Sequence, residues 1–278
     1  MTLTDQDISN FVSALGSSSR YNFTDYSFKS LNRRLLKVLT DNDMDMPALI
    51  DGIKKDGDFL ELVVREITVN TTELFRDPQV WQTLRYTILP KFIQADTIRI
   101  WHAGCSSGQE VYSMMILLNE LKLLEKTEIF GSDINSEALG IARKGIYRYR
   151  FNLNYLDNFD KVVRENPRTK ELCDVPYSKY FKIDKIRDSI TVADFLVKKP
   201  KFIWHDLVNP ESFYLERFDL ILCRNVIIYF NFPLQNKVFS LFYENLSERG
   251  ILVLGEHETI LGPFSDRFTK FDHINIKK

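Results

Sequence analysis

The stretch IRIWHAGCSSGQE, from Ile98 to Glu110, constrains the fold of this chain more than any other. Its first residues, Ile98 to Trp101, form an apolar run that is typical of a buried strand in a parallel sheet. Small residues follow as far as Gly108, and the apolar segment from Val111 to Leu124 then predicts a helix. A strand, a glycine-containing turn and a helix predict the ligand-binding half of a doubly wound α/β sheet.

The composition of this turn narrows the kind of ligand. Glycine lets a backbone approach a ligand closely, but the spacing is not G-x-G-x-x-G, and no Lys-Ser/Thr pair follows Gly108 as in a P-loop. The turn carries Glu110 and no basic residue. An acidic turn suits a cofactor with positive groups, such as S-adenosylmethionine, better than a nucleotide phosphate. The alternative is a strand–helix turn that binds no ligand.

Overall composition excludes several classes of protein. The chain has 278 residues and a net charge of −1, so no overall charge attracts it to nucleic acid or to an anionic membrane. Its three cysteines form no C-x-x-C pair, which fits a reducing cytosol, and its four histidines have no metal-ligand spacing. No apolar run is long enough to span a bilayer. We therefore expect a cytoplasmic protein with no metal and no membrane insertion.

Residues 1–69 predict a small all-helical domain of four short helices, and residues 70–278 a second domain. Capping and helix-breaking residues set the boundaries of the four helices: Thr4 and Gly16 for the first, Ser27 before the second, Pro47 for the third, and Asp58 before Phe59 to Ile67 for the fourth. The second helix has an apolar face and an opposite basic face made by Lys29, Arg33, Arg34 and Lys37. The basic face is either a docking surface for an acidic partner or an ordinary solvated surface.

The segment NTTELFRDP, Asn70 to Pro78, joins the two predicted domains. Pro78 opens a helix that we expect to end at Pro90. A linker with helix caps would account for the threonines, but it does not account for Arg76 beside Phe75 just before the main domain.

Charged residues follow several predicted strands at the edge where doubly wound sheets bind ligands. The second strand, Glu128 to Ile134, contains Asp133, which lies 25 positions after Gly108. An acid there can accept hydrogen bonds from both hydroxyls of a ribose, or it can cap the helix that starts near Glu137. Two later strands, ending near His205 and Cys223, add further polar residues. Candidate ligand-binding residues therefore follow four predicted strands, and they are Gly104, Asp133, Asp206 and Arg224.

The remaining elements complete a Rossmann-like sheet that is mostly parallel and has an antiparallel C-terminal strand. The segments Tyr180 to Ile183 and Ser189 to Val192 predict two paired short strands, which form a small β insertion at about residues 150–200. A helix from about Pro233 to Leu246, a strand from Ile251 to Leu254 and a final hairpin strand from Phe268 to Ile276 follow.

Six segments, in this order along the chain, resemble the chemotaxis receptor methyltransferases of the CheR family. The matching segments are NTTELFRDP at Asn70, AGCSSGQEVYS at Ala103, GSDI at Gly131, KGIYR at Lys144, HDL at His205 and CRNVIIYF at Cys223. The resemblance extends over nearly the whole chain and includes the basic second helix. Members of this family are S-adenosylmethionine-dependent protein-glutamate O-methyltransferases that release S-adenosylhomocysteine.

The resemblance implies roles for individual residues. It implies that the cofactor-binding residues are Asn70, Thr72, Arg76, Ala103, Glu110, Asp133, Asp206, Leu207, Cys223 and Arg224. Within this set Asp133 matches the ribose acid, Asp206-Leu207 a pair beside the adenine, and Cys223-Arg224 a pair at the methionine end. Arg76 and Tyr229 match the two residues that flank the transferred methyl group. The basic face of the second helix would dock the substrate.

The resemblance also implies the reaction and its partner. The expected activity is methylation of glutamate side chains in the cytoplasmic domains of chemotaxis receptors, during adaptation, by a monomeric enzyme without a nucleic-acid partner. Two alternatives stay open, a methyltransferase with a non-receptor acceptor and a signalling module that binds S-adenosylmethionine without turnover. Three departures from the family are visible, one of which is a segment between Tyr147 and Tyr180 that is longer than usual. Gly255-Glu256-His257-Glu258 replaces the usual Gly-His-Ser-Glu, and the region of the receptor-tail-binding β subdomain is short.

Overall fold

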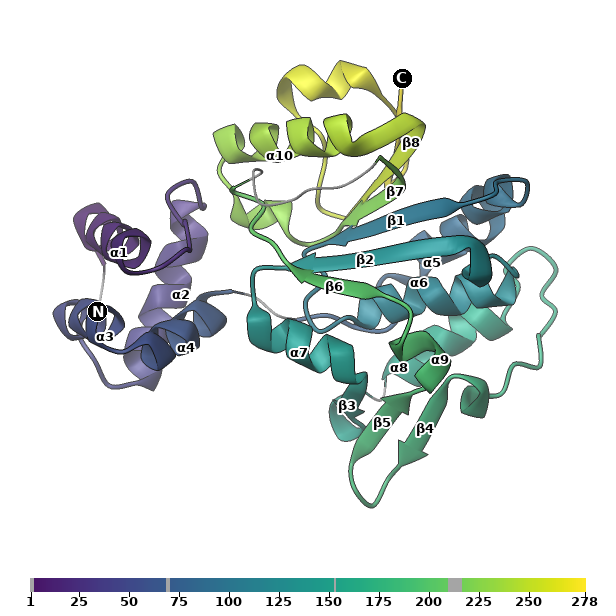
Figure 1. Ribbon diagram of the computed structural model, residues 1–278, viewed down its shortest axis with the longest axis horizontal. Helices are drawn as coiled ribbons and strands as arrows, with labels where there is room; N and C mark the ends of the chain where they lie inside the picture. Colours follow the sequence, from purple (N-terminus) through teal and green to yellow (C-terminus); the bar gives the residue numbers. More distant parts are fainter. Residues whose placement is uncertain (1–2, 69–70, 153, 210–216) are drawn as a thin grey trace.

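The computed structural model describes residues 3–68, 71–152, 154–209 and 217–278, which are organised around one large sheet (Figure 1). Seven strands form it in the order β6-β2-β1-β7-β8-β10-β9. Their bounds are β1 (Ile98–Ala103), β2 (Thr127–Asp133), β6 (Lys201–Trp204), β7 (Phe218–Cys223), β8 (Leu246–Leu254), β9 (Phe268–Phe271) and β10 (Ile274–Lys277). β10 is antiparallel to both neighbours and the other pairs are parallel. The predicted fold class is confirmed.

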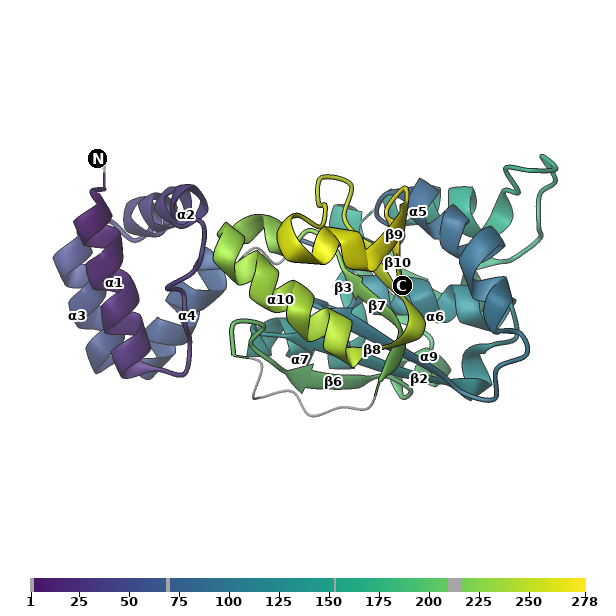
Figure 2. The ribbon, with the colours of Figure 1, turned by 90° about the horizontal axis from the view of Figure 1, so that it is seen from above.

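Helices cover both faces of this sheet, because its central strands are apolar on both sides. α10 (Phe232–Asn245) packs on one face, where Phe242 meets Trp101 edge to face. α6 (Gln109–Glu120) and α7 (Ser136–Lys144) lie on the other face, as Figures 1 and 2 show. α6 is buried along most of its length, which explains its nearly continuous apolar sequence.

The strand registers bring the carboxyl ends of the parallel strands to one edge. Ala103, the last residue of β1, pairs with Ser132, and Asp133, the last residue of β2, pairs with Trp204 at the end of β6. The loops that follow β1, β2, β6 and β7 therefore begin at the same edge of the sheet.

The first four helices pack around a hydrophobic core of their own, which includes Leu15, Leu35 and Leu49. They are α1 (Asp5–Ser18), α2 (Phe28–Asp41), α3 (Met46–Lys55) and α4 (Gly57–Ile67). In Figure 1 they form a separate group at the left, beside the carboxyl edge of the sheet.

Two sets of contacts fix the helical group to that edge. On one side the Arg20 guanidinium lies 3.8 Å from the ring centre of Trp204, and Arg65 pairs with Glu137 at 2.6 Å. On the other side the segment 25–27 runs antiparallel to residues 229–231. There the Ser27 N–H donates to the Tyr229 carbonyl at 2.8 Å, and the Asn231 N–H donates to the Asp25 carbonyl at 2.9 Å.

Two predicted boundaries of the N-terminal helices are wrong. α1 passes Gly16 and ends at Ser18, because the hydroxyl groups of Ser17 and Ser19 accommodate the last turn by donating to carbonyls within the helix. α4 is capped by Asp56 and not by Asp58, since the Asp56 carboxylate accepts from the N–H groups of Asp58 and Phe59.

The helix after the linker also continues beyond its predicted end. α5 (Pro78–Thr83) leads into a π-helix (Leu84–Ile88) and then a 3-10 helix (Leu89–Phe92). Pro90 lies at the second position of this last helix, where a missing N–H breaks no helical hydrogen bond. Proline therefore changes the type of helix here without ending the segment.

A second sheet, of order β3-β5-β4, lies beside the main sheet. β4 (Phe181–Asp184) and β5 (Ser189–Val192) pair antiparallel as predicted. β3 (Ile146–Arg148) was not predicted, because three residues that directly follow the left-handed Gly145 after α7 carry no strand pattern. The helices α8 (Asn154–Phe159) and α9 (Asp194–Val197) belong to the same region, along with a second π-helix (Asp160–Arg164).

Within the described part of the chain, every helix is too short or too polar to cross a membrane.

The two π-helices are joined by a buried arginine, which gives a test of the fold. Arg85 donates to the carbonyls of Val162 and Val163. Replacing it by methionine keeps the apolar stem but leaves both carbonyls buried without a donor, so Arg85→Met should lower the free energy of unfolding by about 1–3 kcal/mol. Chemical denaturation measures the change. Arg164→Met, which removes an exposed ion pair with Asp160, is the control and should have a much smaller effect.

Candidate active site

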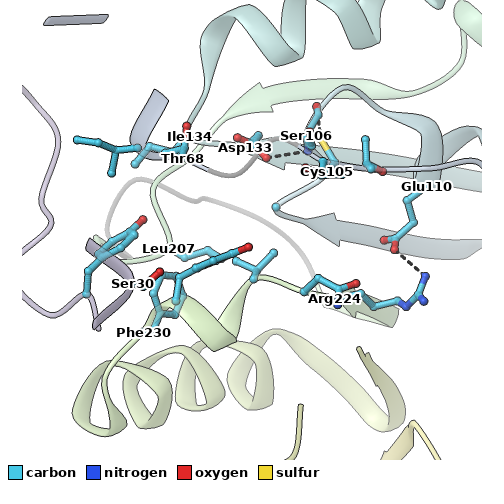
Figure 3. Close-up of a pocket in the computed structure, with 18 of the residues that line it drawn as sticks. Ser30, Thr68, Cys105, Ser106, Glu110, Asp133, Ile134, Leu207, Arg224 and Phe230 are labelled. Carbon is cyan, nitrogen blue, oxygen red and sulfur yellow. Dashed lines mark hydrogen bonds and ion pairs between the residues drawn. The ribbon is translucent and has the colours of Figure 1, made fainter. Parts of the chain in front are cut away.

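A pocket lies between the carboxyl edge of the sheet and the N-terminal helices. It encloses about 1050 Å³, open solvent included, which is enough for a ligand of cofactor size. In Figure 3, Asp133 and Ser106 lie on one side of the pocket, Ser30 and Phe230 on the opposite side, and the paired Glu110 and Arg224 at one end.

The loop after β1 forms one wall of the pocket from backbone. Gly104 has a φ of +75°, and a Cβ added there would lie 2.4 Å from Cγ2 of Val226, so this position requires glycine. Gly108, with a φ of +87°, directly precedes α6 and packs against Ala142 of α7. The turn therefore combines close packing with a backbone that faces the pocket.

Asp133 is buried at the end of β2 and holds this loop. Its carboxylate accepts from the N–H groups of Ser106 at 2.7 Å and Asn135 at 2.8 Å. Burial raises the pKa of Asp133, although these N–H groups oppose the rise. The helix cap of α7 is the Asn135 side chain, which accepts from the Ala138 N–H. The alternative role of Asp133 as that cap is therefore wrong, and its carboxylate can accept a further hydrogen bond from a ligand.

A chain of buried charges crosses the end of the pocket. Glu110 lies with Oε1 2.9 Å from Nδ1 of His102 and Oε2 3.1 Å from Nη1 of Arg224. Nη2 of Arg224 contacts Oδ2 of Asp77 at 2.7 Å and the Arg76 carbonyl at 3.0 Å. Burial alone would raise the pKa of Glu110, but the His102 hydrogen bond and the Arg224 charge together lower it. Glu110 is therefore an anion in the pocket wall.

The linker that carries Arg76 is held in an unusual backbone conformation. Phe75 and Asp77 have φ values of +52° and +56°, which non-glycine residues adopt at a cost. The Phe75 N–H donates to the Ser113 hydroxyl of α6 at 2.8 Å, and Trp81 Nε1 donates to the Arg76 carbonyl at 2.9 Å. These contacts fix the backbone of Arg76, whose side chain lines the pocket.

Asp206 follows β6 in the pocket wall and is 2% exposed. Its Oδ1 accepts from the Val208 N–H at 2.9 Å, whereas its Oδ2 is buried and makes no close hydrogen bond among the described residues, although the Asn22 N–H is near enough to lower the pKa of the carboxyl. Burial raises the pKa of Asp206 to about 6. A buried acceptor without a close partner at a pocket wall is a position for a ligand donor.

Tyr26, from the segment before α2, closes the pocket on the helical side. Its ring packs against Phe23 and Phe230, at 4.3 and 5.2 Å between ring centres. Burial, followed by the charges of Asp206 and Asp133, raises the pKa of Tyr26. Its hydroxyl is therefore neutral near two acids.

The pocket gathers most of the predicted site residues. Those that line it are Thr72, Arg76, Glu110, Asp133, Asp206, Leu207, Arg224 and Tyr229. Ala103 and Cys223 do not line it, because they are the last, buried residues of β1 and β7 and only their successors Gly104 and Arg224 reach the pocket. Asn70 lies outside the described residues.

The predicted basic face of α2 is divided by the structure. Lys29, Arg33 and Lys37, four residues apart, are exposed, whereas Arg34 is half-buried and lines the pocket beside Ser30. Residues four positions apart lie on the same side of a helix, whereas Arg34 comes one residue after Arg33 and therefore points in a different direction. The docking role of Lys29, Arg33, Arg34 and Lys37 therefore stays a prediction, with Arg34 nearest the pocket.

Several pocket residues were not predicted. Tyr26, Ser30, Ile67 and Thr68 come from the N-terminal helices. Their segments have the ordinary pattern of amphipathic helices and their connections, and only the way in which the helical group is fixed to the sheet brings them to the site.

Comparisons with known proteins agree with this geometry. Residues 70–275 match the family model described as "CheR methyltransferase, SAM binding domain". The protein named Cher3 from Pseudomonas putida is 34% identical over 267 residues, covering 95% of this chain and 93% of that protein. Chemotaxis protein methyltransferases from Listeria monocytogenes and Borreliella burgdorferi are each 27% identical, covering 86% and 94% of this chain and 84% and 91% of those proteins.

The sheet and its strand-edge pocket define a doubly wound α/β protein with a ligand site, and the matches define it as a methyltransferase. The chain belongs to the CheR methyltransferase family, and its cofactor is S-adenosylmethionine. The resemblance and the cofactor expected from the sequence are both confirmed.

The residues of the pocket fit this cofactor. The buried Nε of Arg224 has no hydrogen-bond partner among the described residues, so it can donate to a carboxylate such as that of the methionine portion. Oδ2 of Asp206 can accept from an amino group, and Asp133 from hydroxyl groups. Glu110 provides a negative charge in the pocket wall that can attract the positive groups of this cofactor.

The raised pKa of Asp206 predicts a pH-dependent stability. An acid whose pKa is raised from 3.8 to about 6 destabilises the folded protein once ionised, so stability should fall as the pH rises through this range. The loss is about 3 kcal/mol at most. Asp206→Asn cannot ionise, so denaturation at pH 4 and pH 7.5 should show a smaller loss in this variant. Asp219→Asn, far from the pocket, is the control. An equal loss in wild type and Asp206→Asn would contradict the assignment.

Proposed function

We propose that this methyltransferase transfers a methyl group to glutamate side-chain carboxylates of chemotaxis receptors. One observation carries the proposal. Arg76 and Tyr229, which match the family residues that flank the transferred methyl group, come from separate segments and line the same pocket as the cofactor-binding residues. Relatives described as chemotaxis protein methyltransferases support the receptor as acceptor.

The acceptor needs little chemical activation. A glutamate carboxylate, with an ordinary pKa near 4.3, is already ionised at neutral pH, so no residue has to act as a general base. The bound cofactor supplies a methyl group on a positively charged sulfur. What the protein must provide is alignment of the two groups and exclusion of water. Arg76 would orient the carboxylate through its planar guanidinium, and Tyr229 would add a hydrogen bond.

The same pocket would hold the cofactor along its length. Asp133 would accept hydrogen bonds from the ribose hydroxyls, and Asp206 with Leu207 would contact the adenine. Glu110 and the Nε of Arg224 would lie at the methionine end, where opposite charges are needed. Thr72 would reach the cofactor from the linker.

We propose that residues 1–69 form a substrate-docking domain, residues 70–278 the methyltransferase domain, and residues 150–200 an insertion in it. Lys29, Arg33 and Lys37 give the exposed side of α2 a positive charge. The contact between Ser27 and Tyr229 places the first turn of α2 beside the active site. An acidic receptor helix lying along α2 would thus reach the pocket with one of its glutamates. Complementary charge mainly accelerates such an encounter and selects the partner.

Two other functions compete with this proposal. A methyltransferase with a small or non-receptor acceptor would use the same cofactor site, and a signalling module would bind the cofactor without turnover. Transfer of a labelled methyl group from S-adenosylmethionine into base-labile ester on purified receptor cytoplasmic fragments tests the proposal. No transfer with receptor fragments would favour one of the alternatives.

Variants of the two flanking residues test the proposed alignment. Arg76→Ala should lower the methylation rate about 100-fold, the scale expected for a misplaced reactant, and Arg76→Lys should not restore it, because a point charge cannot replace a planar fork. Tyr229→Phe should lower the rate more than the affinity for S-adenosylhomocysteine. Asp133→Ala is the contrast, since it should weaken that affinity by about 1–3 kcal/mol. Near-normal rates in the Arg76 and Tyr229 variants would contradict the alignment roles.

Reversal of charge on α2 tests the docking surface. Lys29→Glu with Arg33→Glu should raise the KM for receptor fragments roughly tenfold at low salt and reduce its salt dependence, because screened long-range attraction is lost. S-adenosylhomocysteine affinity should not change. The matched control is Lys54→Glu with Lys55→Glu, an equal charge change on the separate helix α3. The same KM and salt dependence in both double variants would mean that the basic face of α2 is an ordinary solvated surface and does not dock the receptor.

A further inference from the structure

Glu258, in the loop after β8, is a buried acid with an unusual set of partners. It is 8% exposed, and its carboxylate accepts from five backbone N–H groups. The donors and distances are Gly255 at 2.7 Å, Asn225 at 2.8 Å, Ile227 at 2.8 Å, Val226 at 2.9 Å and Ile228 at 3.4 Å. Four of the five donors are consecutive residues of the loop that follows β7.

In the described part of the chain, those four N–H groups have no carbonyl acceptors in a regular helix or strand. Asn225 has a φ of +60°, and the loop has only one short 3-10 turn, at Ile227–Tyr229, so successive N–H groups converge on one point. Convergent backbone N–H groups form a site for an anion, and here the Glu258 carboxylate occupies it. Burial raises the pKa of Glu258, while the N–H groups of Gly255, Asn225, Val226 and Ile227 lower it.

The loop held in this way connects three parts of the active site. Arg224 directly precedes it and Tyr229 ends it, and both line the pocket. Val226, in its middle, packs against Gly104 of the turn after β1. The position of the Tyr229 side chain relative to Arg224 therefore depends on the conformation of residues 225–228.

We propose that Glu258 is a positioning residue, whose carboxylate sets the loop 225–228 and thereby the placement of Tyr229 for methyl transfer. It does not line the pocket and acts through the loop. The catalytic part of this inference rests on the proposed function, whereas the effect on the loop does not.

Gly255 completes the arrangement and provides a second way to disturb it. A Cβ at this position would lie 2.7 Å from Oε2 of Glu258 and 3.0 Å from the Asn225 nitrogen. Glycine therefore lets the carboxylate approach both the Gly255 N–H and the loop. Gly255→Ala should displace the carboxylate while keeping its charge.

Glu258→Gln is the main test, because the amide is isosteric but directs an N–H₂ group at the converging N–H groups. Amide hydrogen exchange of residues 225–228 should accelerate at least about tenfold, with β7 unchanged. The kcat per S-adenosylhomocysteine-binding site should fall about 10- to 100-fold, the scale of a small misplacement, while the Kd for S-adenosylhomocysteine changes less than about threefold. Asp219→Asn is the matched control, since its carboxylate accepts a single N–H, from Arg99, at the opposite end of β7.

Normalising kcat to binding sites separates positioning from simple loss of folded protein. A kcat per site equal to that of wild type, or unchanged exchange of residues 225–228, would overturn the proposal. If Glu258→Gln does not fold, Gly255→Ala must show the same lowered kcat per site with a nearly unchanged Kd for S-adenosylhomocysteine. A wild-type kcat per site in Gly255→Ala would then overturn the proposal. Wild-type protein that transfers no methyl group to receptor fragments would contradict the proposed function and leave the exchange experiment to decide the role of Glu258 on the loop.

Discussion

The buried guanidinium of Arg224, placed between two carboxylates, is the interaction on which the site depends. A cation removed from water is stable only if opposite charges and hydrogen bonds replace its hydration. Asp77, Glu110 and the Arg76 carbonyl provide them, and they belong to the linker and to the first turn of α6. One side chain at the end of β7 therefore fixes two other segments relative to the sheet, because separating any of them would leave a charge buried and unpaired.

This pairing also determines which charges remain for ligands. Two acids balance Arg224, so its Nε is the donor left for a cofactor group. Among the described residues, the Arg76 side chain donates one long hydrogen bond, to the Thr71 carbonyl at 3.5 Å, and this contact involves no acid. In the proposed reaction, the charge of Arg76 would therefore be available for an acceptor carboxylate. On the proposed function, Arg224 would hold the structure and the cofactor together, and Arg76 would bind the second substrate.

Sequence patterns predicted the elements that are determined by residues close together in the chain. The apolar run at Ile98 and the turn through Gly108 identified β1 and its loop, and the position of Asp133 identified a site residue that is buried in the pocket wall. The errors arose where individual side-chain contacts, which a sequence pattern does not show, decide the outcome. Gly16 did not end α1, since nearby serine hydroxyl groups served its last turn. Arg34 lines the pocket, one helix position away from the exposed Arg33. Ala103 and Cys223 matched family positions, but their side chains face the core and only the next residues reach the pocket.

Glu258 and Tyr26 show why sequence alone could not complete the site. Neither residue type in its segment indicates a role, because an acid in a loop and an aromatic residue before a helix are both common. Their importance comes from the closure of the sheet edge by two segments far apart in the chain. Tyr26 is brought over the strand ends by the antiparallel contact of residues 25–27 with 229–231, and Glu258 holds the preceding residues of that same segment. The chain is thus held at both of these places, at residues 225–228 by Glu258 and at residues 229–231 by the helical group. Because Tyr229 lies where these two attachments meet, its placement is determined by long-range packing more than by local sequence.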